Sequence, residues 1–313
     1  MGVELLHILI IQIFSGDMMS AGGMIKDRKA KIGLFWTISA TIGFSIIPIL
    51  AKLGLATGLS AGILLFYRFF IATVFFFLYC LVRRIRFVLP KKVLLSVLLA
   101  GVIYSVQCLC YFSAFNYISA PLGAVLYNCY PIFVLLLSRM YLAEKITFPK
   151  LFAVIVTILG TVIVLYAPWG IPQIMGIALI IATAFISSVY MVYNKKFTSE
   201  IDSVVLTFYV CMICALCYLI HSLITNEFVI ITNYTIWINV SLLAFWSTII
   251  GLFGFMKAIS LLNVALVSVI TLAEPIFTII LSVIILSEAL TIQQIIGGVV
   301  VIAGIYIYEL KGN

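Results

Sequence analysis

Residues 119–165 read SAPLGAVLYNCYPIFVLLLSRMYLAEKITFPKLFAVIVTILGTVIVL, and residues 263–309 repeat their pattern 144 positions later. The two stretches align without a gap, and about 14 of the 47 paired positions are identical. The matches keep their order, and they pair Pro131 with Pro275 and Glu144 with Glu288. A bias toward apolar residues alone would not align a proline and a glutamate in this way. The chain is therefore a duplicated unit, and we expect its function to lie between the two copies.

The composition indicates which solvent surrounds the chain. Of its 313 residues, 65% are hydrophobic and 9% are charged, and the mean hydropathy is +1.32. No water-soluble domain can cover so much apolar surface, so nearly the whole chain must face lipid or other helices. The apolar runs have the length of roughly 20 residues that a membrane-spanning helix needs. They lack the alternation of barrel strands, so the sequence predicts an all-α membrane protein.

We predict ten transmembrane helices in two repeats of five, at residues 32–167 and 172–309. The expected helices are 32–52, 62–82, 92–114, 119–139 and 148–167 in the first repeat, and 172–193, 203–224, 235–257, 263–285 and 291–309 in the second. A short turn-rich hinge with the interfacial residue Trp169 joins the repeats. No loop is long enough to form a soluble domain, so the function is expected to take place within the membrane.

Residues 1–31 differ from the rest of the chain. Their apolar run, residues 3–14, is too short to cross a bilayer. It has no leading basic cluster and no A-x-A-like cleavage site, which argues against a signal peptide. We expect a loose or interfacial extension, and the alternative is a regulatory amphipathic arm.

The distribution of Lys and Arg predicts the orientation in the membrane. If the N-terminus is cytoplasmic, nearly all these residues fall on inside segments, and the outside segments carry only Lys52. Each copy has an odd number of spans, so the copies must be inverted. Lys145 and Lys150 flank an inside turn, and their aligned partners Ala289 and Gln294 are uncharged. We predict an inner-membrane protein with both termini in the cytoplasm. Its net charge of +8 matches an anionic inner leaflet rather than a nucleic-acid partner.

Motifs for metal, cofactor or nucleotide chemistry are missing from the sequence. Cys211, Cys214 and Cys217 share one helical face, but no His, Asp or Glu lies near them at ligand spacing. We interpret these cysteines as lipid-facing or packing residues. The sequence has no Walker A loop, zinc motif, nucleophile elbow or dinucleotide fingerprint. We therefore expect neither an enzyme nor a bound cofactor, and transport must be driven by an ion or solute gradient.

The C-terminal half of each copy carries a pair of short motifs, YPIF at 130–133 and LAEKIT at 142–147 in the first copy, and EPIF at 274–277 and LSEALT at 286–291 in the second. With these motifs each half resembles the EamA unit of the drug/metabolite transporter superfamily. Arg68, in the second span, is a further point of resemblance to the family. The resemblance covers both repeats and implies the ten-span form with two EamA repeats. It also implies that a small metabolite or drug crosses through a cavity lined by the first, third, fourth, sixth, eighth and ninth spans.

Glu274 is the strongest candidate for a functional residue. It lies about 11 residues into the ninth span, near the middle of the bilayer, where an ionised carboxylate is costly. Pro275 removes a backbone hydrogen bond and exposes a carbonyl group near Thr271, one turn earlier, which creates a polar niche. The carboxyl group suits proton coupling or a cationic group on the substrate. The alternative is a protonated side chain that is hydrogen-bonded to a neighbouring helix.

Three further spans carry polar and aromatic groups that suit a mid-sized organic solute. On the third span Tyr104, Gln107 and Tyr111 recur at i, i+3 and i+7, which forms one stripe. The other predicted substrate-binding residues are Tyr127 and Asn128, before the helix-breaking Pro131 on the fourth span, and Trp246 and Ser247 on the eighth. For each of these residues the alternative is contact between helices without a role in binding.

Arg68 lies within the second span, about one and a half turns from its predicted outer end. Its long side chain can reach the outer surface, so the residue either anchors the helix there or pairs with Glu288. The alternative is a charge partner for a substrate carboxylate.

These observations favour a secondary active transporter that moves a small metabolite, amino acid or drug across the inner membrane by alternating access, as an exporter. The expected partners are the substrate, the lipid bilayer and a coupling proton or counter-solute. One alternative is uptake or exchange of a metabolite such as S-adenosylmethionine or a nucleotide sugar. Another is a non-transporting membrane scaffold or a lipid-handling partner.

Overall fold

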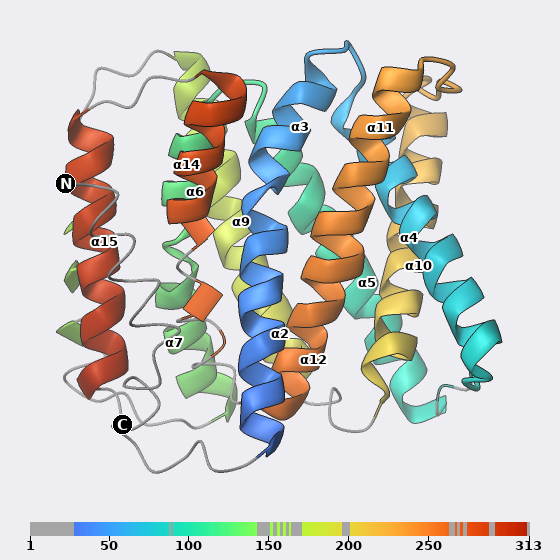
Figure 1. The fold of residues 1–313 in the computed structure, drawn as a ribbon, viewed down its shortest axis with the longest axis horizontal. Helices are drawn as coiled ribbons and strands as arrows, with labels where there is room; N and C mark the ends of the chain where they lie inside the picture. Colours follow the sequence, from blue (N-terminus) through green and yellow to red (C-terminus); the bar gives the residue numbers. More distant parts are fainter. Residues whose placement is uncertain are drawn as a thin grey trace.

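The computed structural model is a bundle of helices that lie side by side (Figure 1). It describes residues 28–87, 89, 91–142, 171–195, 201–262, 274–287 and 292–311, with short pieces between 151 and 163 and between 267 and 271. All regular secondary structure in these residues is helical. Residues 1–27 of the predicted extension and most of the predicted fifth span lie outside the described residues.

The helices of the first repeat are α2 (Arg28–Ser45), α3 (Ile47–Leu55), α4 (Ala61–Arg83), α5 (Lys91–Ala114), α6 (Ala120–Tyr127) and α7 (Tyr130–Leu142). Those of the second repeat are α9 (Ile171–Lys195), α10 (Ser203–Ile224), α11 (Tyr234–Leu243), the π-helix η1 (Ala244–Leu252), α12 (Phe253–Leu261), α14 (Glu274–Leu286) and α15 (Ile292–Lys311). Six described segments are long and apolar enough to cross a membrane: Lys29–Leu55, Ala61–Arg83, Val93–Ala114, Gln173–Asn194, Ser203–Ile224 and Tyr234–Leu261. They agree with six of the ten predicted spans.

Side-chain caps define where the long helices begin. The hydroxyl of Ser60 accepts a hydrogen bond from the backbone N–H of Ile63 at the start of α4. The carboxylate of Asp202 accepts one from Val204 at the start of α10, at 2.8 Å. Such caps satisfy backbone donors that have no partner inside the helix. At its other end, α4 stops at Arg84, which adopts a left-handed conformation with a φ of 54°.

Helices α4 and α10 pack against each other in opposite directions. Near one end of the pair the ring of Phe69 stacks on Tyr218, with 5.8 Å between the ring centroids. Near the other end the ring of Phe77 packs against that of Phe208, with 6.2 Å between the ring centroids. The residue numbers rise along α4 as they fall along α10, so the two helices are antiparallel.

Two further helix pairs bring the first half of the chain against the second. Helix α5 packs on α9, where the ring centroids of Tyr104 and Tyr190 lie 4.8 Å apart. Helix α2 packs on η1 and α12, and Gly43 makes their close approach possible. A Cβ atom at Gly43 would collide with the carbonyl oxygen of Trp246, so only glycine fits there.

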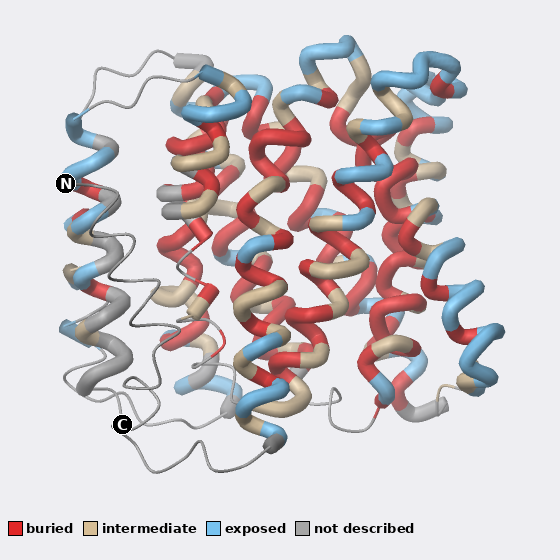
Figure 2. The backbone as a smooth tube through the Cα atoms, in the orientation of Figure 1, coloured by how far each residue is buried: buried red, intermediate tan, exposed pale blue. Residues whose placement is uncertain are grey.

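The distribution of exposed side chains agrees with a protein that lipid surrounds. Buried residues fill the middle of the bundle, and exposed ones cover its outer helices and its ends (Figure 2). The outer face of α4 is almost entirely apolar, with exposed Phe70, Phe75, Phe77, Leu78 and Val82. A patch of this kind is a liability in water, whereas a bilayer covers it without penalty.

Two prolines occupy the second position of helices inside the bundle. Residues 128–129 separate α6 from α7, and Pro131 is the second residue of α7. Pro275 is likewise the second residue of α14, which begins at Glu274. A proline in the first helical turn removes a donor that has no partner there in any case. Both predicted helix breaks therefore fall at helix starts within the bundle.

Candidate functional site

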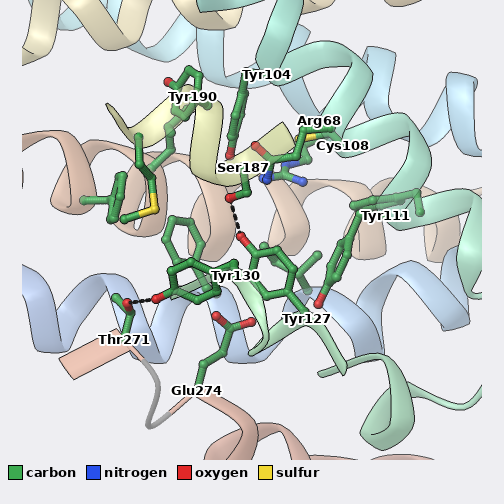
Figure 3. Close-up of a pocket in the computed structure, with 17 residues that line it drawn as sticks. Arg68, Tyr104, Cys108, Tyr111, Tyr127, Tyr130, Ser187, Tyr190, Thr271 and Glu274 are labelled. Carbon is green, nitrogen blue, oxygen red and sulfur yellow. Dashed lines mark hydrogen bonds between the residues drawn. The ribbon is translucent and has the colours of Figure 1, made fainter. Parts of the chain in front are cut away.

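A cavity lies in the middle of the bundle, between the two halves of the chain (Figure 3). The space not filled by atoms is about 700 Å³, part of which is open to the outside. Helices α2 to α7 contribute one part of the wall, and α9, η1, α12 and the region around α14 contribute the other. Seven predicted site residues line it: Arg68, Tyr104, Gln107, Tyr111, Tyr127, Thr271 and Glu274.

The polar stripe predicted on the third span is found along α5. The side chains of Tyr104, Gln107 and Tyr111 are all buried, and all three line the cavity. The ring of Tyr111 packs against Tyr127 of α6, with 5.3 Å between their centroids. The helical spacing of the stripe thus turns three polar groups toward the same space.

Two tyrosines at the break between α6 and α7 connect the two halves of the chain. The hydroxyl of Tyr127 shares a hydrogen bond with Ser187 of α9 at 2.7 Å. That of Tyr130 shares one with Thr271 at 2.8 Å. The two rings stack on each other, with centroids 5.3 Å apart. The interruption of the helix therefore places two aromatic rings at the cavity, each tied to the second repeat (Figure 3).

Arg68 lies inside the protein, and only 1% of its surface is exposed. Its Nε donates a hydrogen bond to the hydroxyl of Thr248 on η1, at 2.8 Å. The guanidinium group lies over the rings of Phe69 and Phe112, 4.7 Å and 5.6 Å from their centroids. The prediction that Arg68 reaches the outer surface is therefore wrong, because the side chain points into the cavity. The other structural alternative involved Glu288, which lies outside the described residues.

Glu274 contributes a carboxyl group to the same cavity. It is the first residue of α14, and 6% of its surface is exposed. Its side chain points into the cavity below the tyrosine pair in Figure 3. The backbone N–H groups in the first turn of a helix favour negative charge, which offsets part of the cost of burying a carboxylate.

Three predicted site residues do not line the cavity. The amide of Asn128 donates to the carbonyl of Ala124, in the preceding turn. The hydroxyl of Ser247 donates to the carbonyl of Leu243. The main chain of Trp246 faces Gly43. The bonds of Asn128 and Ser247 stay within their own stretch of chain, and only the main chain of Trp246 lies against another helix.

The stripe along α9 was missed by the sequence reasoning. Ser187, Tyr190 and Met191 line the cavity from this helix. A signal for them is present in the sequence, because the buried polar residues of α9 recur with helical spacing. They include Thr183, Ser187, Tyr190 and Asn194, at i, i+4, i+7 and i+11, and Ser188 is buried beside them.

Comparison with known proteins identifies the family. Residues 31–166 and residues 174–309 each match the EamA-like transporter family. The chain belongs to this family. The two matched segments contain the helices that form the two parts of the cavity wall, α2 to α7 and α9 to α14.

Relatives of this EamA-like transporter are themselves transporters. It is 28% identical over 195 residues to an uncharacterized transporter of Archaeoglobus fulgidus, an alignment that covers 62% of the chain and 70% of the relative. It is 27% identical over 151 residues to the pseudopaline exporter CntI of Pseudomonas aeruginosa, across 47% of the chain and 52% of that exporter. A crystal structure of another protein, 20% identical, matches 87% of the chain and 96% of its own length with a TM-score of 0.67. This last likeness shows the fold.

Proposed function

We propose that this EamA-like transporter is a secondary active transporter that exports a small organic solute by alternating access. The observation that carries the proposal is the central cavity, which holds a buried arginine from the first repeat and a buried carboxyl group from the second. Charged groups at that depth are rare in membrane proteins and usually mark a solute or ion pathway. The aromatic wall around them suits an organic molecule.

The helix packing supports ten spans in two inverted repeats. Helices α4 and α10 occupy corresponding positions in the two matched segments, and they are antiparallel. Corresponding helices that run in opposite directions require one repeat to be upside down relative to the other. Such repeats can exchange conformations around a fixed midplane site, which opens the site to each side in turn.

The distribution of positive charge supports an orientation in the inner membrane. With the Arg28 end of α2 and the Lys311 end of α15 in the cytoplasm, the turns rich in Lys and Arg also face the cytoplasm. A relative that is named as an exporter supports export as the direction. Glu274 is the proposed coupling group, since it can carry a proton through the transport cycle.

The proposal is tested with purified protein in two steps. A thermal-shift screen against metabolites finds ligands, because a compound that binds the folded state raises its melting temperature. Radiolabelled hits are then followed in proteoliposomes with and without a pH gradient. We expect flux that depends on the gradient, and no flux above protein-free liposomes for any stabilising ligand would refute transport.

Glu274→Gln separates binding from coupling. This variant should keep measurable binding of the ligand, with an affinity lowered by the lost negative charge, but its flux should no longer follow the pH gradient. The matched control is Glu227→Gln, which makes the same change at an exposed glutamate after α10. An unchanged pH profile in Glu274→Gln would remove this residue from the coupling mechanism.

A further inference from the structure

Polar groups without a partner gather in the cavity wall. Among the described residues, eight buried side-chain N or O atoms have no hydrogen-bond partner, and four of them belong to cavity residues. They are Nη2 of Arg68, Oε1 of Gln107 and the hydroxyls of Tyr111 and Tyr190. Buried polar groups in native proteins are nearly always paired, so such a cluster indicates groups that pair with a ligand.

The guanidinium group of Arg68 is held in place but not neutralised. The hydroxyl of Thr248 takes one of its five N–H donors, and the group lies over two aromatic rings. No ion pair to Arg68 is found within the described residues. A buried charge with only a neutral hydroxyl as its partner is strongly unfavourable. A carboxylate on the solute would supply the missing charge and would accept from Nη2.

Glu274 faces the cavity from a different side. Figure 3 shows the ring of Tyr127 between its carboxyl group and the guanidinium group of Arg68, with the stacked ring of Tyr130 to one side. No ion pair between the two groups is found among the described residues, and a solute that reaches both must extend past the ring of Tyr127. A charged pair on one carbon atom, as in an α-amino acid, is too compact to do so.

We propose that the solute is an elongated zwitterion, with a carboxylate at one end that binds Arg68 and a cationic group at the other end that faces Glu274. The section between the charges lies against Tyr127 and Tyr130, and Gln107 and Tyr111 provide the remaining polar contacts. This inference rests on the proposed function and narrows its substrate class.

Isomers with different charge separation test the inference. In 4-(aminomethyl)benzoate the two charges lie at opposite ends of an aromatic ring, and in phenylglycine the same atoms place both charges on one carbon. Calorimetric titration of the purified protein with 4-(aminomethyl)benzoate should give an affinity roughly ten-fold or more above that for phenylglycine. The single-charge analogues 4-methylbenzoate and 4-methylbenzylamine should bind as weakly as phenylglycine. A series from glycine to 8-aminooctanoate should bind more tightly once the chain is long enough to reach both charges.

Variants test the carboxylate end of the solute. Arg68→Gln should weaken 4-(aminomethyl)benzoate to the level of 4-methylbenzylamine. Because Arg68 also binds Thr248, this variant can fail to fold, so Tyr111→Phe provides a second test. It removes a hydroxyl that has no protein partner, and it should weaken binding about ten-fold without lowering the melting temperature. The control is Tyr218→Phe, whose lost hydroxyl donates to the carbonyl of Ser105, and which should lower stability but not affinity.

Several results would overturn the inference. They are equal binding of phenylglycine and its isomer, binding of 4-methylbenzoate or 4-methylbenzylamine as tightly as the zwitterion, and no binding by any compound of either set. In each case the proposed function still stands if a different solute, found in the metabolite screen, shows gradient-dependent flux. If no solute shows flux, both the proposed function and the inference fail.

Discussion

The hydroxyl oxygen of Tyr130 lies 2.8 Å from that of Thr271, so the first residue of α7 is linked to a residue of the second repeat three positions before α14 begins. The two residues belong to equivalent regions of the duplicated unit, since Tyr127 aligns with Thr271 and Tyr130 with Glu274. The same backbone position therefore presents an aromatic ring in one copy and a carboxyl group in the other. Duplication supplied the scaffold, and divergence at these positions made the cavity chemically asymmetric.

The link between Tyr130 and Thr271 should stabilise this conformation of the bundle. Tyr130→Phe removes one buried hydrogen bond, and we expect it to reduce stability by about 0.5–1.5 kcal/mol. The melting temperature of the purified protein measures the effect. Tyr111→Phe is the control, because its hydroxyl has no partner among the described residues. Equal losses in the two variants would mean that the hydrogen bond contributes nothing.

Thr248 should hold Arg68 in position for the solute. Thr248→Val keeps the size of the side chain but removes the acceptor of the Arg68 hydrogen bond, and bonds to charged groups contribute about 1.5–3 kcal/mol. We expect lower stability together with weaker solute binding in titrations. Thr207→Val makes the same change at a buried threonine whose hydroxyl donates to its own helix, and should leave binding intact. Normal affinity in Thr248→Val would show that Arg68 does not need this support.

The inverted arrangement predicts the sides on which two aligned turns lie. Single cysteines introduced at Lys145 and at Ala289 should react with a membrane-impermeant maleimide from opposite faces of the membrane. Labelling of each cysteine is compared between intact cells, which expose the outer face of the membrane, and inverted vesicles, which expose the inner face. Reaction of both positions from the same face would exclude inverted repeats.

Repeats, apolar runs and the stripe on α5 could all be predicted from the sequence, because each follows from local spacing. The buried position of Arg68 could not, since the sequence does not reveal that Thr248 on η1 lies against α4. Asn128 is predicted to bind the solute, but its polar side chain is satisfied locally. Its amide bonds to the carbonyl group at Ala124 in its own helix, and composition cannot distinguish that contact from a bond to a solute.

The central claim is that a solute crosses the membrane between the two repeats. The accessibility of a cavity residue from each face of the membrane tests this claim most directly. Ser187→Cys places a thiol on the cavity wall, in a protein whose seven native cysteines are replaced by alanine. Labelling of this thiol in vesicles of either orientation should occur from both faces, and a bound solute should slow it from both. Labelling from one face alone, or labelling that the transported solute does not slow, would contradict alternating access through this cavity.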